Sequence, residues 1–357
     1  MNVSILGDGL SSITLANMLV NQGVKVDIFS DKKTKKYNKI QTLGISKTNI
    51  EFFNNNILNI NKFLWNIDNI EIYSENLKNE KILNFENKDD HLFSIVRNCN
   101  LYNYLLFNLK KNKLVKFKKK IKYSNLFKKK YDLIFNCDYF NQVSKKFFFR
   151  KIDKNYKSFA HITTFEHKKI SNNHIASQVF TKNGPLAFLP VSSKETSVVY
   201  SAKGEKDINL KDYILKYNMK YQNLRFNEIN CFELKSSNLR SYYYKNIIAF
   251  GDLLHRLHPL AGQGFNMTIR DIKELQRLIE FKKKHGLSLD NSICIDFEKN
   301  TKNKNFLFSS GIDFIYEFFN LENKFKDKKL SKLVKFLGKN KITNKFFIKL
   351  ADKGIII

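Results

Sequence analysis

The chain begins with NVSILGDGLSSITLANMLVNQGVKVDIFS (residues 2–30), and this stretch predicts how the fold starts. Residues 2–6 form a short apolar run typical of a buried strand. Residues 13–19 place apolar side chains at helical spacing, ahead of Gly23, a residue type that often ends helices. A second apolar run follows at residues 24–29. Strand, helix and strand in this order predict a β-α-β unit and therefore a parallel sheet.

The turn between the first strand and the helix has the spacing Gly7-x-Gly9-x-x-Ser12, with Leu10 and Ser11 inside it. Two glycines permit a tight turn and let a pyrophosphate approach the backbone at the helix N-terminus. Ser12 stands where a third glycine is usual, and it is small enough for a helix to pack closely on a strand. An ordinary structural turn would have the same spacing, so this motif alone is weak evidence for a ligand.

Asp31 follows the second predicted strand, where dinucleotide-binding folds offer an acidic side chain to the adenosine ribose. We expect Asp31 to serve in this way, although it lies one position beyond the usual site. An exposed aspartate that merely follows a strand would look the same.

A stronger signal lies at GDLLHRLHPLAGQGFN (residues 251–266), which contains three of the thirteen glycines and one of the three prolines. A strand over residues 247–251 would place Asp252 where it accepts hydrogen bonds from ribitol hydroxyls. Residues 262–266 begin a second helix, whose backbone N–H groups would face an anion. The positive end of that helix suits the negative charge of a reduced isoalloxazine ring.

The same window contains His255 and His258, an H-x-x-H pair that could suggest a metal site. No cysteine or carboxylate cluster completes a coordination shell, and Pro259 places the pair in a loop. We therefore predict no metal and a role in positioning the loop. The four cysteines are widely spaced and form no C-x-x-C pair, which indicates a reducing compartment.

The rest of the chain divides into a few patterns. Residues 70–85 and 159–202 alternate apolar and polar positions, which favours an antiparallel sheet. Residues 101–109 are helical in pattern, residues 131–137 resemble a strand that returns to the first sheet, and the chain after residue 251 is mostly helical. The first lobe is therefore expected to be assembled from discontinuous segments.

The charge is strongly basic, with 63 lysines and arginines against 33 acidic residues and a net charge of +30. Such a balance suggests nucleic acid or an anionic membrane as partner. Only seven of the basic residues are arginine, however, and the lysines lie among many Asn, Ile, Phe and Tyr, which share A/T-rich codons. No helix-turn-helix, zinc-finger or RNP-like pattern is present, so we predict no nucleic-acid partner. The start of the chain has no leader-like pattern, and we expect a cytoplasmic protein.

The second window resembles the signature of class A flavoprotein monooxygenases with the para-hydroxybenzoate hydroxylase fold. It is most similar to the ubiquinone-biosynthesis hydroxylases of the 2-polyprenyl-6-methoxyphenol hydroxylase type. The matching positions are Gly251-Asp252, His258-Pro259-x-Ala261-Gly262-Gln263-Gly264-x-Asn266 and Arg270-Asp271. Further similarity covers residues 184–190 and 197–200, Arg97 with Leu101 and Leu105, and a C-terminal helix at residues 345–354. Two positions depart: Asn136-Cys137-Asp138-Tyr139 keeps the aspartate of an Asp-Gly motif without its glycine, and Gln41 stands where arginine is frequent.

The resemblance implies an α/β fold with a FAD-binding Rossmann-like domain, an antiparallel-sheet substrate domain and C-terminal helices. We expect the FAD-binding domain at residues 1–65, 96–158 and 240–290, the substrate domain at 66–95 and 159–239, and the helical region at 291–357. The implied cofactor-binding residues are Gly7, Gly9, Leu10, Ser11, Ser12, Asp31, Arg97, Asp138, Gly251, Asp252, Pro259, Gly262, Gln263, Gly264, Phe265 and Asn266. Of these, Pro259, Gly262, Gln263 and Gly264 form the loop beside the flavin, and no acid or base is assigned.

The activity implied by the resemblance is aromatic hydroxylation. NAD(P)H, visiting transiently, reduces FAD, and O2 then gives a flavin C4a-hydroperoxide that oxygenates a lipophilic polyprenyl phenol. Two alternatives stay open: a hydroxylase or epoxidase for another aromatic or isoprenoid substrate, and a catalytically silent quinone-binding subunit.

A lipophilic substrate draws attention to the membrane. Apolar residues interleaved with lysines predict a basic amphipathic helix near the C-terminus, at Leu330, Leu333, Val334, Leu337, Phe346, Phe347 and Leu350. Such a helix would lie on the inner face of the cytoplasmic membrane, or it would dock its apolar face on the protein. Contact with a ubiquinone-biosynthesis complex is a further expectation.

Overall fold

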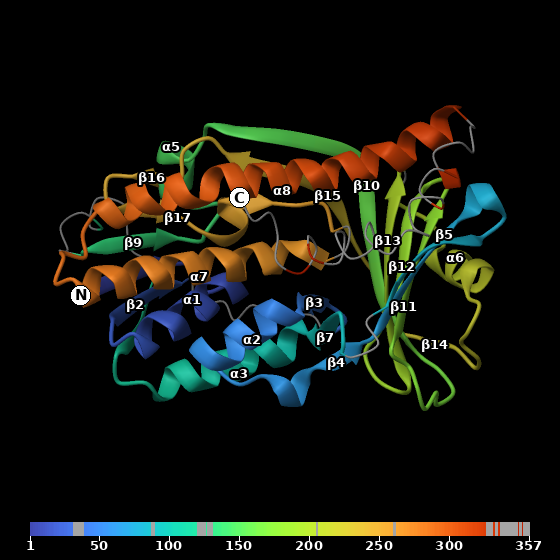
Figure 1. Cartoon of the computed structure of the whole chain (residues 1–357), viewed down its shortest axis with the longest axis horizontal. Helices are drawn as coiled ribbons and strands as arrows, with labels where there is room; N and C mark the ends of the chain where they lie inside the picture. The colour runs from blue at the N-terminus through green and yellow to red at the C-terminus, as the bar shows by residue number, and fades with distance from the viewer. Residues whose placement is uncertain are drawn as a thin grey trace.

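The computed structural model describes residues 1–30, 39–86, 90–119, 126, 131–204, 206–259, 262–325, 331–332, 335, 349 and 352. Two lobes lie side by side, one around a parallel sheet and one around a large antiparallel sheet (Figure 1). The long helix α8 (Ser292–Phe325) runs across both. Asp31, Ala261 and the predicted amphipathic positions between residues 330 and 350 lie outside the described residues.

The first sheet has its described strands in the order β16-β17-β9-β1-β2-β8. All neighbouring pairs are parallel except β16 with β17. The predicted opening β-α-β unit is confirmed, and so are the returning strand and the strand that begins at residue 247. The bounds are β1 (Asn2–Leu6), β2 (Lys25–Ser30), β8 (Val115–Lys119), β9 (Leu133–Asn136), β16 (Tyr243–Tyr244) and β17 (Ile247–Ala249).

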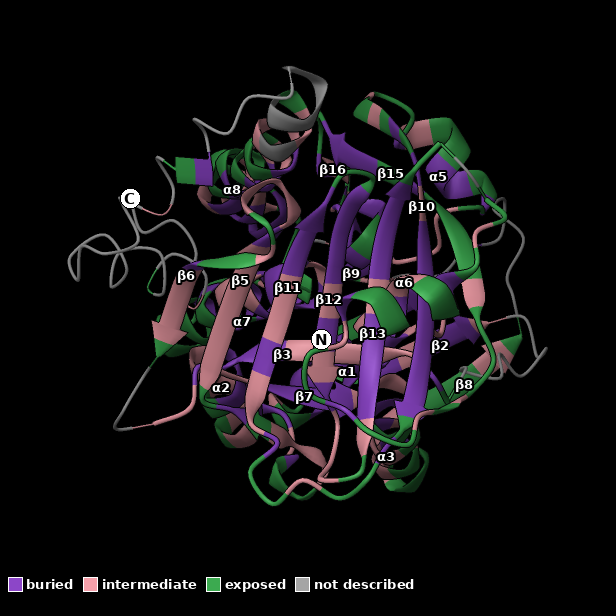
Figure 2. Ribbon diagram, turned by 90° about the vertical axis from the view of Figure 1, so that its right-hand side faces the viewer, coloured by how far each residue is buried: buried purple, intermediate pink, exposed green. Residues whose placement is uncertain are grey.

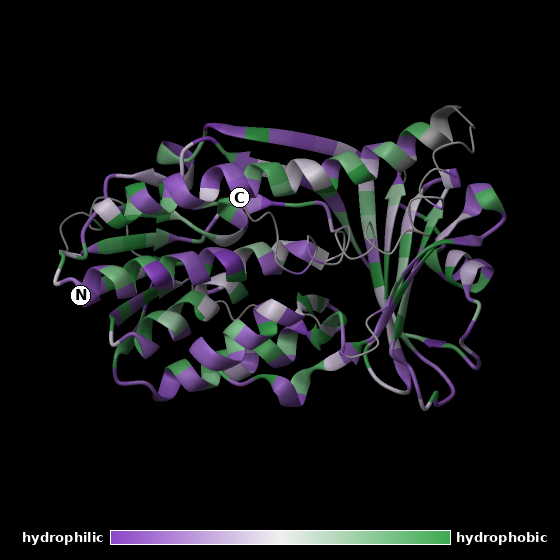
Figure 3. Cartoon of the chain, in the orientation of Figure 1, coloured by the Kyte–Doolittle hydropathy of each residue, from purple (hydrophilic) through white to green (hydrophobic). Residues whose placement is uncertain are grey.

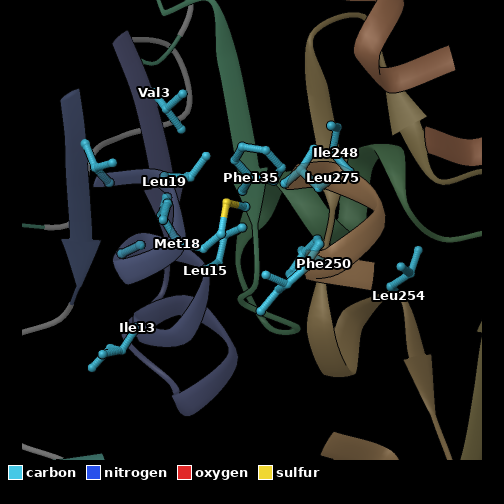
Figure 4. Close-up of a cluster of buried hydrophobic side chains, with 14 of the residues drawn as sticks. Val3, Ile13, Leu15, Met18, Leu19, Phe135, Ile248, Phe250, Leu254 and Leu275 are labelled. Carbon is cyan, nitrogen blue, oxygen red and sulfur yellow. The ribbon is translucent and has the colours of Figure 1, made fainter. Parts of the chain in front are cut away.

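Helices cover this sheet on both sides and bury its apolar strands. Leu15 and Met18 of the first helix pack in one cluster with Phe135 of β9 and Phe250, which follows β17 (Figure 4). The rings of Phe135 and Phe250 meet edge to face with centroids 5.9 Å apart. Polar and apolar residues alternate along the helices, as expected for elements with one buried face (Figure 3). The helices are α1 (Leu10–Asn21), α2 (Lys47–Asn56), α3 (Asn98–Lys111), α5 (Gln142–Phe147) and α7 (Gln263–Lys284).

The second sheet has the order β18-β15-β10-β13-β12-β11-β5-β6 among the described strands, with β14 beside β10. The antiparallel pattern predicted for residues 70–85 and 159–202 is confirmed, but β5 pairs with β11 in parallel. One hundred residues separate these two strands, which leaves ample chain for the crossover that a parallel pair requires. The bounds are β5 (Asn69–Ser74), β6 (Glu80–Glu86), β10 (Lys151–Glu166), β11 (Ile175–Thr181), β12 (Gly184–Pro190), β13 (Glu195–Lys203), β14 (Arg225–Phe226), β15 (Asn230–Leu239) and β18 (His255–Arg256).

The central strands of the second sheet are largely buried (Figure 2). One face packs against α6 (Leu210–Tyr217), through Val198, Tyr200 and Phe188. A small sheet of β3 (Thr42–Ser46), β7 (Phe93–Arg97) and β4 (Trp65–Ile67) lies between the large ones. The remaining short elements are η1 (Asn61–Phe63), η2 (Glu75–Leu77) and η3 (Gly251–Leu253). Strand β10 begins in the first lobe and ends in the second, and the predicted domain boundaries stay a prediction.

The Phe250 side chain should be a major contributor to the core of the first lobe. It is fully buried, so Phe250→Ala removes a ring and leaves a cavity that the surrounding β-strands cannot fill. We expect the free energy of unfolding to fall by about 3–5 kcal/mol, measured by urea denaturation followed by circular dichroism. Phe281→Ala is the control, because Phe281 is 51% exposed. Equal losses for the two variants would contradict this account of the core.

Candidate functional site

The first turn of α1 presents backbone N–H groups that no described side chain caps. Gly9 is the N-cap residue and has extended backbone, and no acidic residue lies in the first turn. Gly7 has φ +108°, a conformation that favours glycine, and its N–H donates to the Phe29 carbonyl (2.9 Å). Leu10, Ser11 and Ser12 form the turn that follows. A free helix N-terminus of this kind attracts an anion.

Asp138 lies beside this turn, at the carboxyl end of β9. A Cβ atom placed on Gly7 would lie 3.4 Å from the Asp138 backbone nitrogen. The Asp138 carboxylate accepts a hydrogen bond from the Phe140 N–H (2.9 Å), which shapes the turn after the strand. Tyr139, which replaces the expected glycine, accepts a hydrogen bond from Lys151 at its hydroxyl oxygen. The Tyr139 side chain, which replaces the glycine of the family pattern, therefore points away from the turn and toward β10.

Gly251 brings the second predicted motif against the first, although 240 residues separate it from Ser11. Gly251 has φ +63°, and a Cβ atom placed there would lie 2.7 Å from Ser11 Cβ. No side chain larger than hydrogen fits at this contact. The neighbouring Asp252 is exposed beside the same turn. Burial raises the pKa of the nearby Cys137 thiol to about 12, with the charges of Asp252 and Asp138 adding to the effect.

The start of α7 is a second uncapped helix terminus. Gly262 is its N-cap residue with φ +62°, and the Gly262 N–H donates to the Pro259 carbonyl (3.1 Å). No described side chain caps this end, and the first turn contains no acidic residue. Gln263 is only 8% exposed, yet its Oε1 atom has no hydrogen-bond partner among the described residues. The expected flavin loop therefore contains both a free helix N-terminus and a buried unpaired acceptor.

Asn266 was predicted to contact the cofactor, but the described protein groups occupy its amide. Its Oδ1 accepts hydrogen bonds from the Ser46 N–H and from Asn49 Nδ2, both at 2.9 Å. Its Nδ2 donates to the Gly44 carbonyl (2.9 Å). The Asn266 side chain thus fixes the start of α7 against β3 and α2, and its contact with a cofactor stays a prediction. Gly264, between Gln263 and Phe265, has open space where a Cβ would stand, and Phe265 is buried in the core.

Asp352 reaches the same region from the C-terminal end of the chain. Its carboxylate accepts hydrogen bonds from the Thr48 N–H (2.9 Å) and the Thr48 hydroxyl (2.5 Å), and so caps α2. Its carbonyl accepts from the Ser46 hydroxyl (3.0 Å) and from Arg270 (3.1 Å). Burial lowers the pKa of the Arg270 guanidinium to about 10. The predicted similarity at residues 345–354 gave no indication of this cap.

Arg97, another predicted cofactor contact, joins the small sheet to the second sheet. Its guanidinium pairs with Glu195 of β13 and donates to the Lys39 carbonyl (3.2 Å). Beside it, the Thr42 hydroxyl donates to the Ser197 hydroxyl (2.9 Å). Arg97 therefore contributes to the contact between lobes, and its role toward a cofactor stays a prediction.

The two histidines of the loop are both buried, in different surroundings. His255 Nε2 lies 2.5 Å from Asp271 Oδ2, and Asn305 Nδ2 donates to the other carboxylate oxygen (2.9 Å). His258 packs against the rings of Tyr156 and Tyr316, with centroids 4.8 and 4.4 Å away. Burial lowers the pKa of His258 to about 3. Within the described part of the chain, no three His, Cys, Asp or Glu side chains converge as metal ligands.

The face of the second sheet opposite α6 looks toward the first lobe. Val198 and Tyr200 pack on α6, so Val199 between them points the other way. Strand pairing extends this position into a row of partly buried or buried side chains at Ile72, Gln178, Ala187, Val199 and Ile162. Beside the row, Phe180 packs with Met267 of α7 and with Phe308 and Ile312 of α8. The wall between the lobes is therefore mostly apolar and suits an aromatic or aliphatic ligand.

Comparison with known proteins agrees with this arrangement. The chain is 21% identical over 218 residues to the mitochondrial ubiquinone biosynthesis monooxygenase COQ6 of Schizosaccharomyces pombe, a match covering 47% of this chain and 46% of that protein. It is 27% identical over 149 residues to the 3-demethoxyubiquinol 3-hydroxylase of Escherichia coli, covering 39% and 38% of the two chains. The matches thus span less than half the length of these relatives. No family model matches.

Solved structures agree over nearly the whole chain. The p-nitrophenol 4-monooxygenase of Pseudomonas putida DLL-E4 superposes with a TM-score of 0.79 at 12% identity, covering 98% of both chains. PqsL of Pseudomonas aeruginosa, a probable FAD-dependent monooxygenase, gives 0.71 at 14% identity, with 94% of this chain and 99% of that one covered. The sequence resemblance to ubiquinone-biosynthesis hydroxylases is confirmed, and the fold is the one shared by these monooxygenases.

The contact between Gly251 and Ser11 can be tested with a matched glycine. Gly286 has the same φ of +63° but open space around a Cβ, so Gly286→Ala reports backbone strain alone, about 1 kcal/mol. Gly251→Ala adds the clash with Ser11 and should lower the free energy of unfolding further, measured by urea denaturation. The additional loss of unfolding free energy in Gly251→Ala, relative to Gly286→Ala, should be smaller when Ser11→Gly is also present. An excess unchanged by Ser11→Gly would show that the two motifs are not in contact.

Burial of His258 should make the protein less stable in mild acid. The unfolded chain takes up a proton below a pH of about 6.5, whereas the folded histidine stays neutral to about 3, so stability falls as pH decreases between these values. His258→Phe removes this contribution, and its stability loss between pH 7 and 5 should be about 2 kcal/mol smaller than that of the wild type. Urea denaturation at both pH values measures the difference. The exposed His285, changed to Phe, is the control, and identical behaviour of the two variants would contradict the assignment.

Proposed function

We propose that the chain binds FAD and uses it to hydroxylate the ring of a lipophilic phenol, with NAD(P)H as transient electron donor and O2 as co-substrate. The observation that carries the proposal is a pair of uncapped helix N-termini, that of α1 beside Gly251 and that of α7 beside Gly44. A dinucleotide-bound flavin has negative charge at two separated places, its pyrophosphate and its reduced ring, and it needs one positive terminus for each.

The residues present fit that cofactor. The turn from Gly7 to Ser12 leaves backbone N–H groups for the pyrophosphate, and Asp252 is exposed nearby as an acceptor for sugar hydroxyls. The turn from Gly262 to Gly264 would hold the ring, since it combines open space with the unpaired Gln263 Oε1. An unpaired buried acceptor is unfavourable by about 1–3 kcal/mol, and a ligand N–H group would relieve that penalty.

When bound, FAD supplies the electron transfer and the oxygen chemistry of the reaction. The protein would position the cofactor and the substrate and shield them from water. The start of α7 stabilises negative charge on the ring, and Asn266 keeps this helix start fixed against β3. The apolar wall between the lobes excludes water and orients the substrate. No side chain is assigned as acid or base.

The substrate class follows from that wall and from the relatives. Ile72 and Phe180 of the second sheet pack with Met267 and Phe308, and this apolar contact suits a phenol that bears a hydrocarbon tail. The relatives in ubiquinone biosynthesis favour a polyprenyl phenol over other aromatic or isoprenoid substrates. A substrate drawn from a membrane would place the protein at the inner face of the cytoplasmic membrane, alone or with other enzymes of the same biosynthesis.

The first test is the absorbance of the purified protein between about 350 and 500 nm, before and after anaerobic NADH or NADPH. We expect a flavin spectrum that bleaches on reduction, and NAD(P)H oxidation that is coupled to product formation with a polyprenyl phenol. A protein that takes up no flavin after reconstitution would favour a silent quinone-binding subunit, and Tyr139 and Gln41, the two departures from the family pattern, would then explain the loss of FAD binding.

The Gln263 side chain allows a sharper test. Gln263→Leu should weaken FAD binding about tenfold, because a single hydrogen bond to the cofactor is lost, and flavin fluorescence quenching measures this. Gln276→Leu on the same helix is the control, since Gln276 bonds to Asn56 and Glu280. The control should change stability and leave FAD affinity unaltered. Equal FAD affinity of wild type and Gln263→Leu would remove Gln263 from the site.

A further inference from the structure

An exposed group of aromatic and aliphatic side chains lies at one end of the first lobe, and it begins with Phe140, two residues after Asp138. Its most exposed members are Phe140 (79%), Phe149 (60%) and Ile152 (44%), with Tyr244 beside them. They come from the segments on either side of α5, from the start of β10 and from β16, and these elements lie together in Figure 1. We call this group, with the cations described next, the α5 patch.

Three contacts link neighbouring parts of the α5 patch. Phe147 stacks on Tyr244 with ring centroids 4.0 Å apart, and this contact joins α5 to β16. The Arg240 N–H donates to the Arg150 carbonyl (3.0 Å), which places these two exposed arginines next to each other. On the other side, Tyr139 contacts the Phe140 ring, with centroids 5.2 Å apart.

Cations surround the apolar side chains. Exposed basic residues flank them in sequence or in space, at Lys145, Lys146, Arg150, Arg240 and Lys245. Several lie over the patch's own rings: Arg150 over Phe149, Lys146 over Phe147 and Lys245 over Tyr244, each at 5.8 Å from the ring centroid. The acidic neighbour Asp153 is paired with Lys151 (3.3 Å). The patch therefore combines exposed apolar area with excess positive charge.

We propose that the α5 patch docks the protein on an anionic lipid surface. Aromatic rings at the level of the headgroups, with lysines and arginines beside them, match the chemistry of that interface. Single-stranded nucleic acid also attracts aromatic and basic residues, but it requires ring faces that are open for base stacking. Here Phe147 and Tyr244 stack on each other, and Ile152 adds an aliphatic side chain, so a lipid surface fits better.

The inference rests on the proposed function in one respect, because a lipophilic substrate gives the protein a reason to visit the membrane. None of the helices in the described part of the chain is long and apolar enough to cross a bilayer, so docking would be peripheral. The C-terminal helix expected from the sequence lies outside the described residues, and the α5 patch is independent of it. Strand β10 runs from the patch into the second sheet, which ties the docked surface to the predicted substrate lobe.

Co-sedimentation of the full-length protein with vesicles tests the proposal. Vesicles of equal parts phosphatidylcholine and phosphatidylglycerol should bind the protein, and vesicles of phosphatidylcholine alone should not. The double variant F140S/F149S should bind the anionic vesicles at least about tenfold more weakly, because the apolar contact is lost. The control is F107S, since Phe107 is 56% exposed on α3 and has Lys111 over its ring at 4.0 Å. F107S should bind like the wild type.

A second pair of variants separates the patch from the general charge of +30. K145A/K146A should weaken binding about tenfold, whereas K110A/K111A, with the same change in net charge at the end of α3, should change it about twofold or less. All variants should unfold at the wild-type temperature, because the altered side chains are exposed.

Equal binding by the patch variants and their controls would overturn the proposal, and so would a wild-type protein that ignores anionic vesicles. Displacement from vesicles by a short single-stranded RNA, with the same dependence on Phe140 and Phe149, would assign the patch to nucleic acid. A change of mass on size-exclusion chromatography in F140S/F149S would assign it to a second copy. Because sedimentation needs no turnover, patch-dependent binding by a flavin-free protein would uphold the patch and reject the proposed function.

Discussion

The fold depends on a close approach between two glycine-containing turns that are far apart in the sequence. The arrangement depends on a contact in which the Gly251 backbone lies against Ser11 at a distance that no Cβ atom would allow. The strands that precede the two motifs, β1 and β17, flank β9 in a single parallel sheet, so both chains leave the sheet at the same edge. The described first turns of α1 and α7 contain no acidic residue and no side-chain cap, so each helix end favours negative charge nearby. The proposed cofactor, with two separated negative charges, would satisfy both helix ends.

Local patterns in the sequence predicted most of the fold because short-range physics determines them. The opening β-α-β unit, the strand at residues 133–136 and the long helix after Gly262 all follow from apolar spacing and glycine positions. The parallel pairing of β5 with β11 was not predictable, since an alternating strand looks the same in either direction. The glycine-rich windows likewise identified where the site lies, because tight turns and close approaches leave few residue choices.

The roles of individual polar residues could not be predicted from local sequence patterns. Asn266 belongs to the most specific motif in the chain, but whether its amide faces a ligand or the protein depends on Ser46 and Asn49, more than 200 residues away. Asp352 caps a helix 304 residues earlier, and no pattern within either segment signals the pairing. The basic residues could not be assigned to a surface from the sequence either, because the lysines are spread along the whole chain. Lys146, Arg150 and Lys245 come together around exposed rings only in the folded structure.

Two neighbouring polar residues at the start of α7 show how a ligand contact can be distinguished from a structural one. Both Gln263 and Asn266 are buried, and a buried amide must find partners or destabilise the fold. Asn266 finds all of its partners in the protein, so its contribution is complete without a ligand. Gln263 Oε1 finds none among the described residues.

Other buried oxygens, such as that of Ser237, also lack described partners, so this property alone does not identify a site. Gln263 differs because it lies in the first turn of an uncapped helix, after a glycine in the left-handed conformation, where the helix end already attracts negative charge. Two independent requirements, an acceptor without a donor and a positive end without an anion, are met together by one ligand that offers both.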